Sequence, residues 1–220
     1  MPAVTTRRQF LSTSAAALAT PFIGTGRAFA QMENWDAWDE QVTPPGYNPT
    51  TSNPWNLAPR FLPHRVSANP RLRPGDIHVD AVARYLYHIE EGGTAMRYGV
   101  AIGRDDLYQP GTFTVGRKAK WPQWTPTANM IARDPQYAEF AGGMPGGPTN
   151  PLGARALYLY SGNTDTYLRI HGTPQPWSIG YRASSGCVRM VMRHIMDLYE
   201  NVETGSVVHL YPAEQGSYTG

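Results

Sequence analysis

Glycine and proline punctuate this chain so densely that few long helices can form in it. The 220 residues include 22 glycines and 20 prolines, nearly a fifth of the total, where average usage is roughly 12%. Both residue types disfavour helix interiors, so a helical bundle and a coiled coil are excluded. No Gly-X-Y repeat is present, which excludes collagen. An apolar content of 41% is sufficient for a folded core.

The first 30 residues have the pattern of an export signal. The pair Arg7-Arg8 lies in a twin-arginine context over residues 6–11, and an apolar stretch follows it. Small residues then flank Phe29 in the Ala-Phe-Ala sequence of residues 28–30, which is typical of a cleavage site. This order of parts resembles a bacterial Tat signal peptide cut after Ala30, and it predicts a periplasmic protein.

Beyond this leader the chain is almost electrically neutral. Residues 31–220 carry 16 basic and 17 acidic side chains. Nucleic-acid binding needs a basic face, and this balance does not supply one, so no nucleic-acid partner is expected. No run of 18 apolar residues occurs, so no membrane-spanning helix is expected either.

The rest of the sequence divides into a segment, a domain and a tail. Residues 31–75 are rich in proline and tryptophan and predict a mostly irregular segment. Residues 76–213 have the periodicity of a folded domain, and residues 214–220 form a C-terminal tail. Four aromatic residues of the first segment are placed to pack it onto the domain as an apolar strap: Trp35, Trp38, Trp55 and Phe61.

Short apolar runs between turns predict that the domain is mostly β. The expected strands are 77–80, 83–89, 95–102, 112–115, 156–160, 166–171 and 206–211. One helix is expected, from Val188 to Val202, because apolar residues recur there at spacings of 3 and 4. The stretch 121–153 is a long loop, which in a compact domain is often a binding loop or lid. We therefore expect a β-sandwich or barrel with one principal helix.

The single cysteine, Cys187, lies in a Ser-Ser-Gly-Cys turn directly before that helix. A helix N-terminus stabilises negative charge, so this position predicts a lowered thiol pKa. Arg182 and Arg189 would act in the same direction. The alternative is a buried, inert thiol, since free cysteines are often buried. Polar neighbours and glycine favour the accessible, reactive thiol.

A nucleophilic cysteine usually needs a base, and six histidines are available. His171 ends a predicted strand before a turn, where its side chain can reach a site at the sheet edge. His194 lies off the apolar stripe of the helix, so we expect it on the surface. His88 and His209 are expected to be structural, while His64 and His78 carry little information. No His-x-His, no HExxH and no second cysteine occur, so neither a metal nor a cofactor is expected.

The residues around His171 and Cys187 resemble the signature of the L,D-transpeptidase (YkuD) family. That signature is a His-Gly pair, a gap, and then Ser-x-Gly-Cys followed by an apolar residue and Arg or Asn; here it lies in residues 170–173 and 180–190. Weaker similarity covers residues 108–113 and 150–157, and the whole resemblance spans about 76–212. Many members have a histidine two positions before the cysteine, where this chain has Ser185, so His171 is left as the base.

The resemblance implies a two-step acyl transfer on peptidoglycan. Cys187 would attack the L-centre carbonyl of a diamino acid in a tetrapeptide stem, D-Ala would leave, and an amine would attack the thioester. His171 would move the protons, the Gly172 backbone would orient the imidazole, and the amides of Ser185, Gly186 and Cys187 would form an oxyanion hole. The residues expected to bind substrate are Arg182, Arg189, Ser184, Trp177 and Tyr181, and carbapenems are expected to acylate the thiol.

Other functions remain open at this point. The acceptor amine could belong to a second stem or to an outer-membrane protein. Water as acceptor would make the protein an L,D-carboxypeptidase or endopeptidase, and loop shape rather than the motif decides between these reactions. A noncatalytic wall-binding module is disfavoured because binding alone needs no thiol. A papain-like peptidase is disfavoured because there the cysteine precedes the histidine in the chain.

Overall fold

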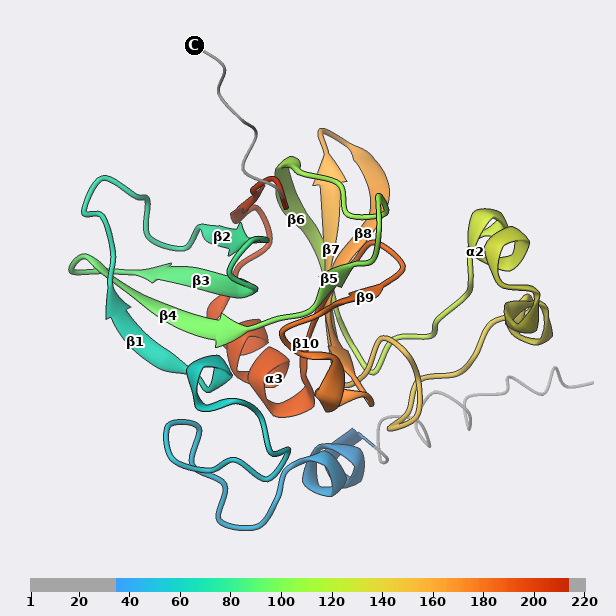
Figure 1. The fold of residues 1–220 in the computed structure, drawn as a ribbon, viewed down its shortest axis with the longest axis horizontal. Coiled ribbons are helices and arrows are strands. Elements are labelled where there is room, and N and C mark those ends of the chain that lie inside the picture. The colour runs from blue at the N-terminus through green and yellow to red at the C-terminus, as the bar shows by residue number, and fades with distance from the viewer. Residues whose placement is uncertain (1–34, 214–220) are drawn as a thin grey trace, which may run out of the picture.

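A nine-stranded sheet dominates the computed structural model, which describes residues 35–213 (Figure 1). The predicted leader and the tail 214–220 lie outside the described residues. The strands of the sheet, in chain order, are β1 (His64–Ser67), β2 (Ile77–Asp80), β3 (Tyr85–Glu90), β4 (Thr94–Gly99), β6 (Gly111–Lys120), β7 (Arg155–Ser161), β8 (Thr164–Thr173), β10 (Val188–Val191) and β11 (Val207–Leu210). Two short strands form a separate pair: β5 (Ile102–Gly103) and β9 (Arg182–Ser184).

The strand order across the sheet is β1-β4-β3-β2-β11-β6-β7-β8-β10. The neighbours β2 and β11 run parallel, as do β8 and β10, and the other neighbours are antiparallel. An isolated bridge between Ala101 and Arg189 links the chain after β4 to the edge strand β10. The expected mostly β fold is confirmed, and it places β8 and β10 side by side at one edge.

The two strands in the middle of this sheet, β2 and β11, have side chains that alternate between its two faces. Ile77 and Val79 on β2 are fully buried, and so is Val208 on β11. Because successive residues of a strand face opposite sides, His78 and His209 lie on the other face of the same two strands. The apolar face packs against the core, and the histidines are directed away from it.

The helix predicted over 188–202 is present, but it begins four residues later than the sequence predicts. The first four residues of the predicted range form β10, and the helix α3 (Met192–Asn201) begins only afterwards. The apolar residues of the predicted stripe are nevertheless all buried. Val188 and Val191 are β-branched and pair with β8, which favours a strand there over a helical turn. The helix then packs against β7 and β8, below the sheet in Figure 1.

The segment before β2 contains more regular structure than the sequence predicts. It includes a helix over 35–42, a short 3₁₀ helix η1 (Pro59–Phe61) and the edge strand β1. In Figure 1 it passes along the side of the domain where α3 lies. Trp38 packs edge-on against Trp121 at 5.4 Å between ring centroids. The Asp39 carboxylate also forms a salt bridge of 2.6 Å with Arg155, whose side chain is buried.

This segment also buries His194, which the sequence places on the surface. The His194 ring packs edge-on against Trp55, 5.4 Å between centroids, and only 1% of the residue is exposed. The helical stripe alone could not reveal this contact, because Trp55 comes from a distant part of the chain. The prediction of a solvated His194 is therefore wrong.

The long stretch between β6 and β7 is not a plain loop. It contains α2 (Ala128–Arg133) and the 3₁₀ helix η2 (Pro135–Phe140), which extend from the sheet at the right of Figure 1. An isolated bridge between Trp124 and Met144 closes its base. The side chain of Asn150, 1% exposed, donates hydrogen bonds to the Met144 and Pro145 carbonyls and fixes the return to β7.

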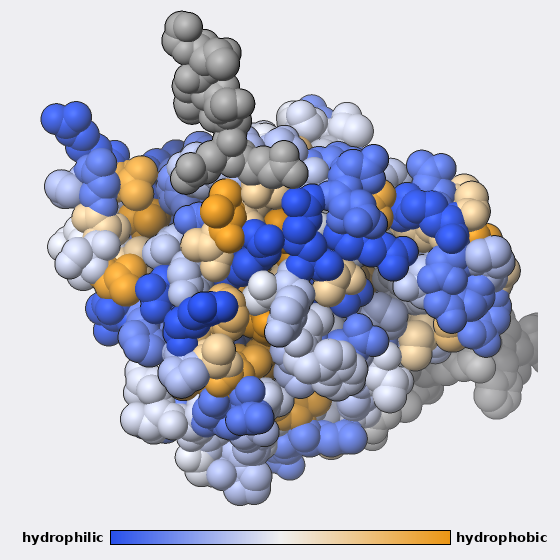
Figure 2. Space-filling view, in the orientation of Figure 1, coloured by the Kyte–Doolittle hydropathy of each residue, from blue (hydrophilic) through white to orange (hydrophobic). Residues whose placement is uncertain are grey.

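The visible face of the molecule is mostly hydrophilic, with hydrophobic residues in scattered spots (Figure 2). Large apolar side chains that are exposed come from separate elements: Val82, Tyr167, Trp177, Tyr181 and Tyr211. No helix between residues 35 and 213 has both the length and the apolar character needed to cross a membrane.

Candidate active site

Cys187 lies in the turn between β9 and β10 and is half-buried. The helix α3 begins at Met192, five residues later, so the thiol is not at a helix N-terminus. The predicted contribution of the helix dipole to its pKa is therefore wrong. The neighbouring strand and side chains must set the reactivity of this thiol instead.

The turn that carries Cys187 is fixed from within by Ser184. The Ser184 hydroxyl donates to the Cys187 carbonyl oxygen at 2.5 Å and accepts from the Gly186 amide at 3.2 Å. Ser184 is only 2% exposed, so it holds the turn in shape rather than facing a substrate. Since the Gly186 amide already donates inside the turn, the oxyanion prediction rests on the amides of Ser185 and Cys187.

Strand pairing relates the positions of Cys187 and His171. In the parallel pair, Val188 lies opposite Ile170 and Arg189 lies opposite His171. Val188 and Ile170 are both buried in the core. Arg189 and His171 therefore face the opposite side, and Cys187, two residues before Arg189 and directly before β10, is expected on that side as well.

One nitrogen of His171 is already engaged. Its Nδ1 lies 2.6 Å from the Gly172 carbonyl oxygen, and a carbonyl can only accept, so Nδ1 carries the proton. Burial first, and the positive charge of Arg189 second, lower the pKa of the His171 imidazole to about 3. The ring is thus neutral at physiological pH. The Leu152 backbone also forms a hydrogen bond with the ring and, like the Gly172 carbonyl, raises its pKa.

The thiol of Cys187 is less acidic than the sequence predicts. Burial raises its pKa above the ordinary value, while a hydrogen bond from the Arg169 backbone and the charges of Arg169 and Arg189 pull the pKa down. Its Sγ also lies 3.7 Å from the Tyr167 carbonyl oxygen, as a donor would. The predicted lowered pKa is contradicted, because desolvation outweighs the two arginines. The resting pair is a neutral thiol with a neutral imidazole.

The arginine that sequence reasoning missed is Arg169. It lies on the same face as His171, two residues earlier on β8, and its guanidinium binds both carboxylate oxygens of Asp165 at 2.7 and 2.9 Å. The ring of Tyr158 lies beneath it at 4.0 Å. The two-residue spacing from His171 on a predicted strand was the available signal.

The two arginines that the sequence singled out occupy different places. Arg189 faces the thiol, and its Nη1 donates to the Gln175 side chain at 3.2 Å. Arg182 instead donates to the Asp105 carbonyl oxygen and lines an open hollow of about 620 Å³. Neither Cys187 nor His171 lines that hollow. Arg189 is therefore the predicted arginine that lies near the thiol, and substrate binding by Arg182 stays a prediction.

Both predicted cleft aromatics are exposed. Trp177, in the 3₁₀ helix η3 (Pro176–Ser178), is 69% exposed and Tyr181 is 67% exposed. They belong to the segment between β8 and β9, whose Gln175 contacts Arg189. Their rings are thus available to a ligand instead of packing in the core.

Metal-ligating residues of the described chain do not gather at Cys187. Between residues 35 and 213 the group able to hold a metal ion is Asp76, His78 and His209, on β2 and β11. Three strands, β6, β7 and β8, separate β11 from β10 in the sheet. The chemistry available at Cys187 is therefore that of a thiol and an imidazole.

Comparison with known proteins agrees with this geometry. Residues 74–210 match the family model described as YkuD, the L,D-transpeptidase catalytic domain, so the chain belongs to the L,D-transpeptidase family. A relative from Escherichia coli (strain K12), "Probable L,D-transpeptidase ErfK/SrfK", is 30% identical over 152 residues, covering 68% of this chain. The match covers 47% of that relative, so the chain spans about half its length.

A solved structure of a carbamoyl enzyme shows a similar fold. The structure described as "Structure of the Ldtfm-avibactam carbamoyl enzyme" is 17% identical, covers 65% of this chain and 51% of its own, and superposes with a TM-score of 0.50. A Brucella melitensis protein described as "Probable carnitine operon oxidoreductase caia" is 49% identical over 70% of this chain and 96% of its own, with a TM-score of 0.49. A superposition of that degree carries no argument about function.

Proposed function

We propose that this protein is a cysteine-dependent L,D-transpeptidase acting on peptidoglycan stems. Cys187 Sγ forms a thioester with the L-centre carbonyl carbon of the diamino acid in a tetrapeptide stem, and the bond to D-Ala breaks. The amine of a second stem, or of an outer-membrane protein, then displaces Sγ. The family match over residues 74–210 supports this reaction class.

In this proposal the protons pass through Nε2 of His171. Since the thiol rests protonated, His171 Nε2 takes its proton as Sγ attacks and then gives it to the departing D-Ala amine. In the second step the same nitrogen takes a proton from the acceptor amine and returns it to the thiolate. The Gly172 carbonyl keeps Nδ1 protonated throughout, and this orients the ring.

The observation that carries the proposal is the shared face of Cys187 and His171. The parallel pairing of β8 with β10 supports this arrangement, because it sets His171 opposite Arg189, two residues after Cys187. Arg169 and Arg189 add positive charge on the same face, which suits a substrate with a free carboxylate and a developing oxyanion. A purely structural pair would not need this charge.

The same site can serve water as the acceptor. An L,D-carboxypeptidase or endopeptidase would share every step up to the thioester. Trp177 and Tyr181 are exposed on the segment between β8 and β9, whose Gln175 contacts Arg189, and they favour an acceptor that binds a surface over free water. We therefore prefer transpeptidation and keep hydrolysis as the alternative.

Incubation with purified disaccharide-tetrapeptide monomers followed by mass spectrometry tests the reaction. Transpeptidation yields cross-linked dimers with loss of one D-Ala per new bond. Trimmed monomers alone would establish hydrolysis, and unchanged substrate would support the noncatalytic module. The Cys187→Ala variant is the control, and it must leave the substrate intact.

We further propose that a Tat-type leader exports the chain to the periplasm, where peptidoglycan is found. The Arg7-Arg8 pair and the Ala-Phe-Ala sequence of residues 28–30 support this. Protein isolated from the native host should begin at Gln31. Replacing both arginines with lysine should keep the precursor in the cytoplasm, and an unchanged periplasmic yield would contradict the assignment.

A further inference from the structure

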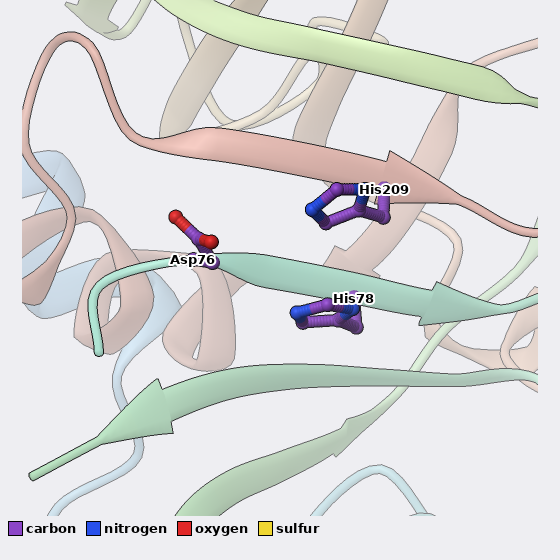
Figure 3. Close-up of side chains that lie close together, drawn as sticks. All are labelled: Asp76, His78 and His209. Atoms are coloured by element: carbon purple, nitrogen blue, oxygen red, sulfur yellow. The ribbon is translucent and has the colours of Figure 1, made fainter. Parts of the chain in front are cut away.

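Three potential metal ligands meet on the outer face of β2 and β11. Asp76 and His78 are two residues apart and so lie on one face of the chain, while His209 lies opposite His78 in the parallel register. One ligand atom from each residue can be chosen so that all three lie within 4.8 Å of one another. Figure 3 shows the two rings one above the other, with a nitrogen of each on the side of the Asp76 carboxylate.

A hydroxyl group lies within hydrogen-bond distance of the other nitrogen, Nδ1, of each histidine. His78 Nδ1 lies 2.8 Å from the Tyr211 hydroxyl, and His209 Nδ1 lies 3.2 Å from the Thr112 hydroxyl. Each hydroxyl oxygen can accept a hydrogen bond from Nδ1, which leaves the Nε2 lone pair able to bind an ion. Metal-binding histidines use this arrangement, with one nitrogen on the ion and the other held by a hydrogen-bond partner.

The Nε2 atom of His78 is buried and has no hydrogen-bond partner. His78 is 7% exposed, and Asp76 is equally buried. Leaving a buried polar atom unpaired costs free energy, so such an atom in a folded protein calls for an explanation. A cation bound by this nitrogen and the carboxylate would supply one.

We propose that Asp76, His78 and His209 bind one divalent transition-metal ion of the zinc type. Two imidazole nitrogens and one carboxylate oxygen are a ligand set that Zn²⁺ accepts, with water in the fourth position. Tetrahedral zinc bonds of about 2.0–2.2 Å place donor atoms roughly 3.3 Å apart. The rings, stacked at 4.6 Å and 21°, therefore tilt toward each other on binding. His209 is only half-buried, which gives the ion a path from solvent.

The ion would stabilise the fold and take no part in acyl transfer. It ties β2, the first strand in the family match, to β11, the last. The three intervening strands between β11 and β10 keep it away from Cys187 in the sheet order. This inference does not depend on the proposed transpeptidase activity.

Zinc titration by calorimetry, in the Cys187→Ala background that removes the thiol as a competing ligand, tests the site. We expect one Zn²⁺ per chain and a raised melting temperature. Losing a residue that only hydrogen-bonds to a metal ligand typically lowers the metal affinity 10–100-fold. Asp76→Asn and His209→Ala each change a ligand itself, so each should weaken zinc binding by at least about 100-fold. Tyr211→Phe, which removes only the hydroxyl on His78 Nδ1, should weaken it by about 10-fold or more.

His64→Ala is the matched control, because His64 is an exposed histidine on the edge strand β1. It should leave zinc affinity unchanged. Circular dichroism without metal checks that each variant is folded. If a variant is not folded, His209→Gln takes its place, and the visible spectrum of bound Co²⁺ reports on metal binding. The proposal is overturned if folded Cys187→Ala protein binds no Zn²⁺, or if Asp76→Asn and His209→Ala bind it as tightly as their parent.

Discussion

Two regions of this molecule each bury a histidine, and they use it in opposite ways. At the β8–β10 edge, His171 is 4% exposed, and its Nδ1 is held by the Gly172 carbonyl. Under the N-terminal segment, His194 lies between the rings of Trp55 and Tyr98, and neither of its ring nitrogens has a hydrogen-bond partner. Burial lowers the pKa of both imidazoles to about 3.

The comparison teaches that a perturbed pKa alone does not mark a base. Desolvation dominates at both positions, so the titration of the two rings is alike. What differs is the surroundings: His171 shares a face with a thiol and two arginines, whereas aromatic rings flank His194. We therefore expect changes at His171 to alter reaction rate and changes at His194 to alter stability.

The largest expected effect separates the two regions by rate. His171→Ala should slow acylation of Cys187 by about 10²–10⁴-fold, since it removes the base that accepts the thiol proton. His194→Phe should change that rate by no more than about twofold, because the ring lies outside the thiol's surroundings. Single-turnover acylation measured by intact mass compares them. A greater loss in His194→Phe would reverse the assignment.

The second effect separates the regions by stability. The pKa of His194 is about 3 in the folded protein and about 6.5 when unfolded, so the unfolded chain binds more protons between these values. Its contribution to stability is complete above pH 6.5 and is lost as pH falls toward 3. This histidine should reduce the free energy of unfolding by about 2 kcal/mol at pH 5 relative to pH 8.

The His194→Phe variant tests this second effect, because phenylalanine fills a similar volume and cannot titrate. Urea unfolding at pH 5 and pH 8 should show a pH difference smaller by about 2 kcal/mol than in the wild type. An equal pH difference in the two proteins would mean that His194 is charged in the folded state.

The smallest expected effect concerns the charged side chains around the thiol of Cys187. The positive charge of Arg169 lowers the pKa of Cys187, and the negative charge of Asp165 raises it. Arg169→Gln should therefore raise the pKa of Cys187 and slow its alkylation by iodoacetamide at pH 8. Asp165→Asn should accelerate it. Changes in the same direction for both variants would contradict this electrostatic description.

The sequence was sufficient for most of the longer strands, but not for β1, β9 and β10 or for the start of the helix. Turns and alternating apolar residues located strands such as β2, β7 and β11 within a few residues. The apolar spacing of Val188 and Val191 fits a helix as well as a strand, and pairing with β8 decided between them. With the helix displaced to Met192, the prediction of an acidic thiol lost its main support.

Some of the site residues could also be predicted from the sequence, and others could not. Cys187 and His171 were identified by a motif, and strand pairing sets His171 opposite Arg189, two residues after Cys187. The contact of Trp55 with His194 and the approach of His78 to His209 join residues far apart in the chain, and no local pattern encodes them. Ser184 resembled a substrate ligand because its hydroxyl is polar, but its hydrogen bonds lie inside the turn.

Carbapenem acylation tests the central claim most directly, because Cys187 is the only thiol in the chain. Intact mass spectrometry should show one adduct per molecule, located by digestion on the peptide that contains Cys187. The adduct should be absent in Cys187→Ala, and Cys187→Ser should lose nearly all turnover of muropeptides. Wild-type protein that stays unmodified while folded, and reacts at Cys187 only after denaturation, would show that this thiol is structural and would contradict the proposed nucleophile.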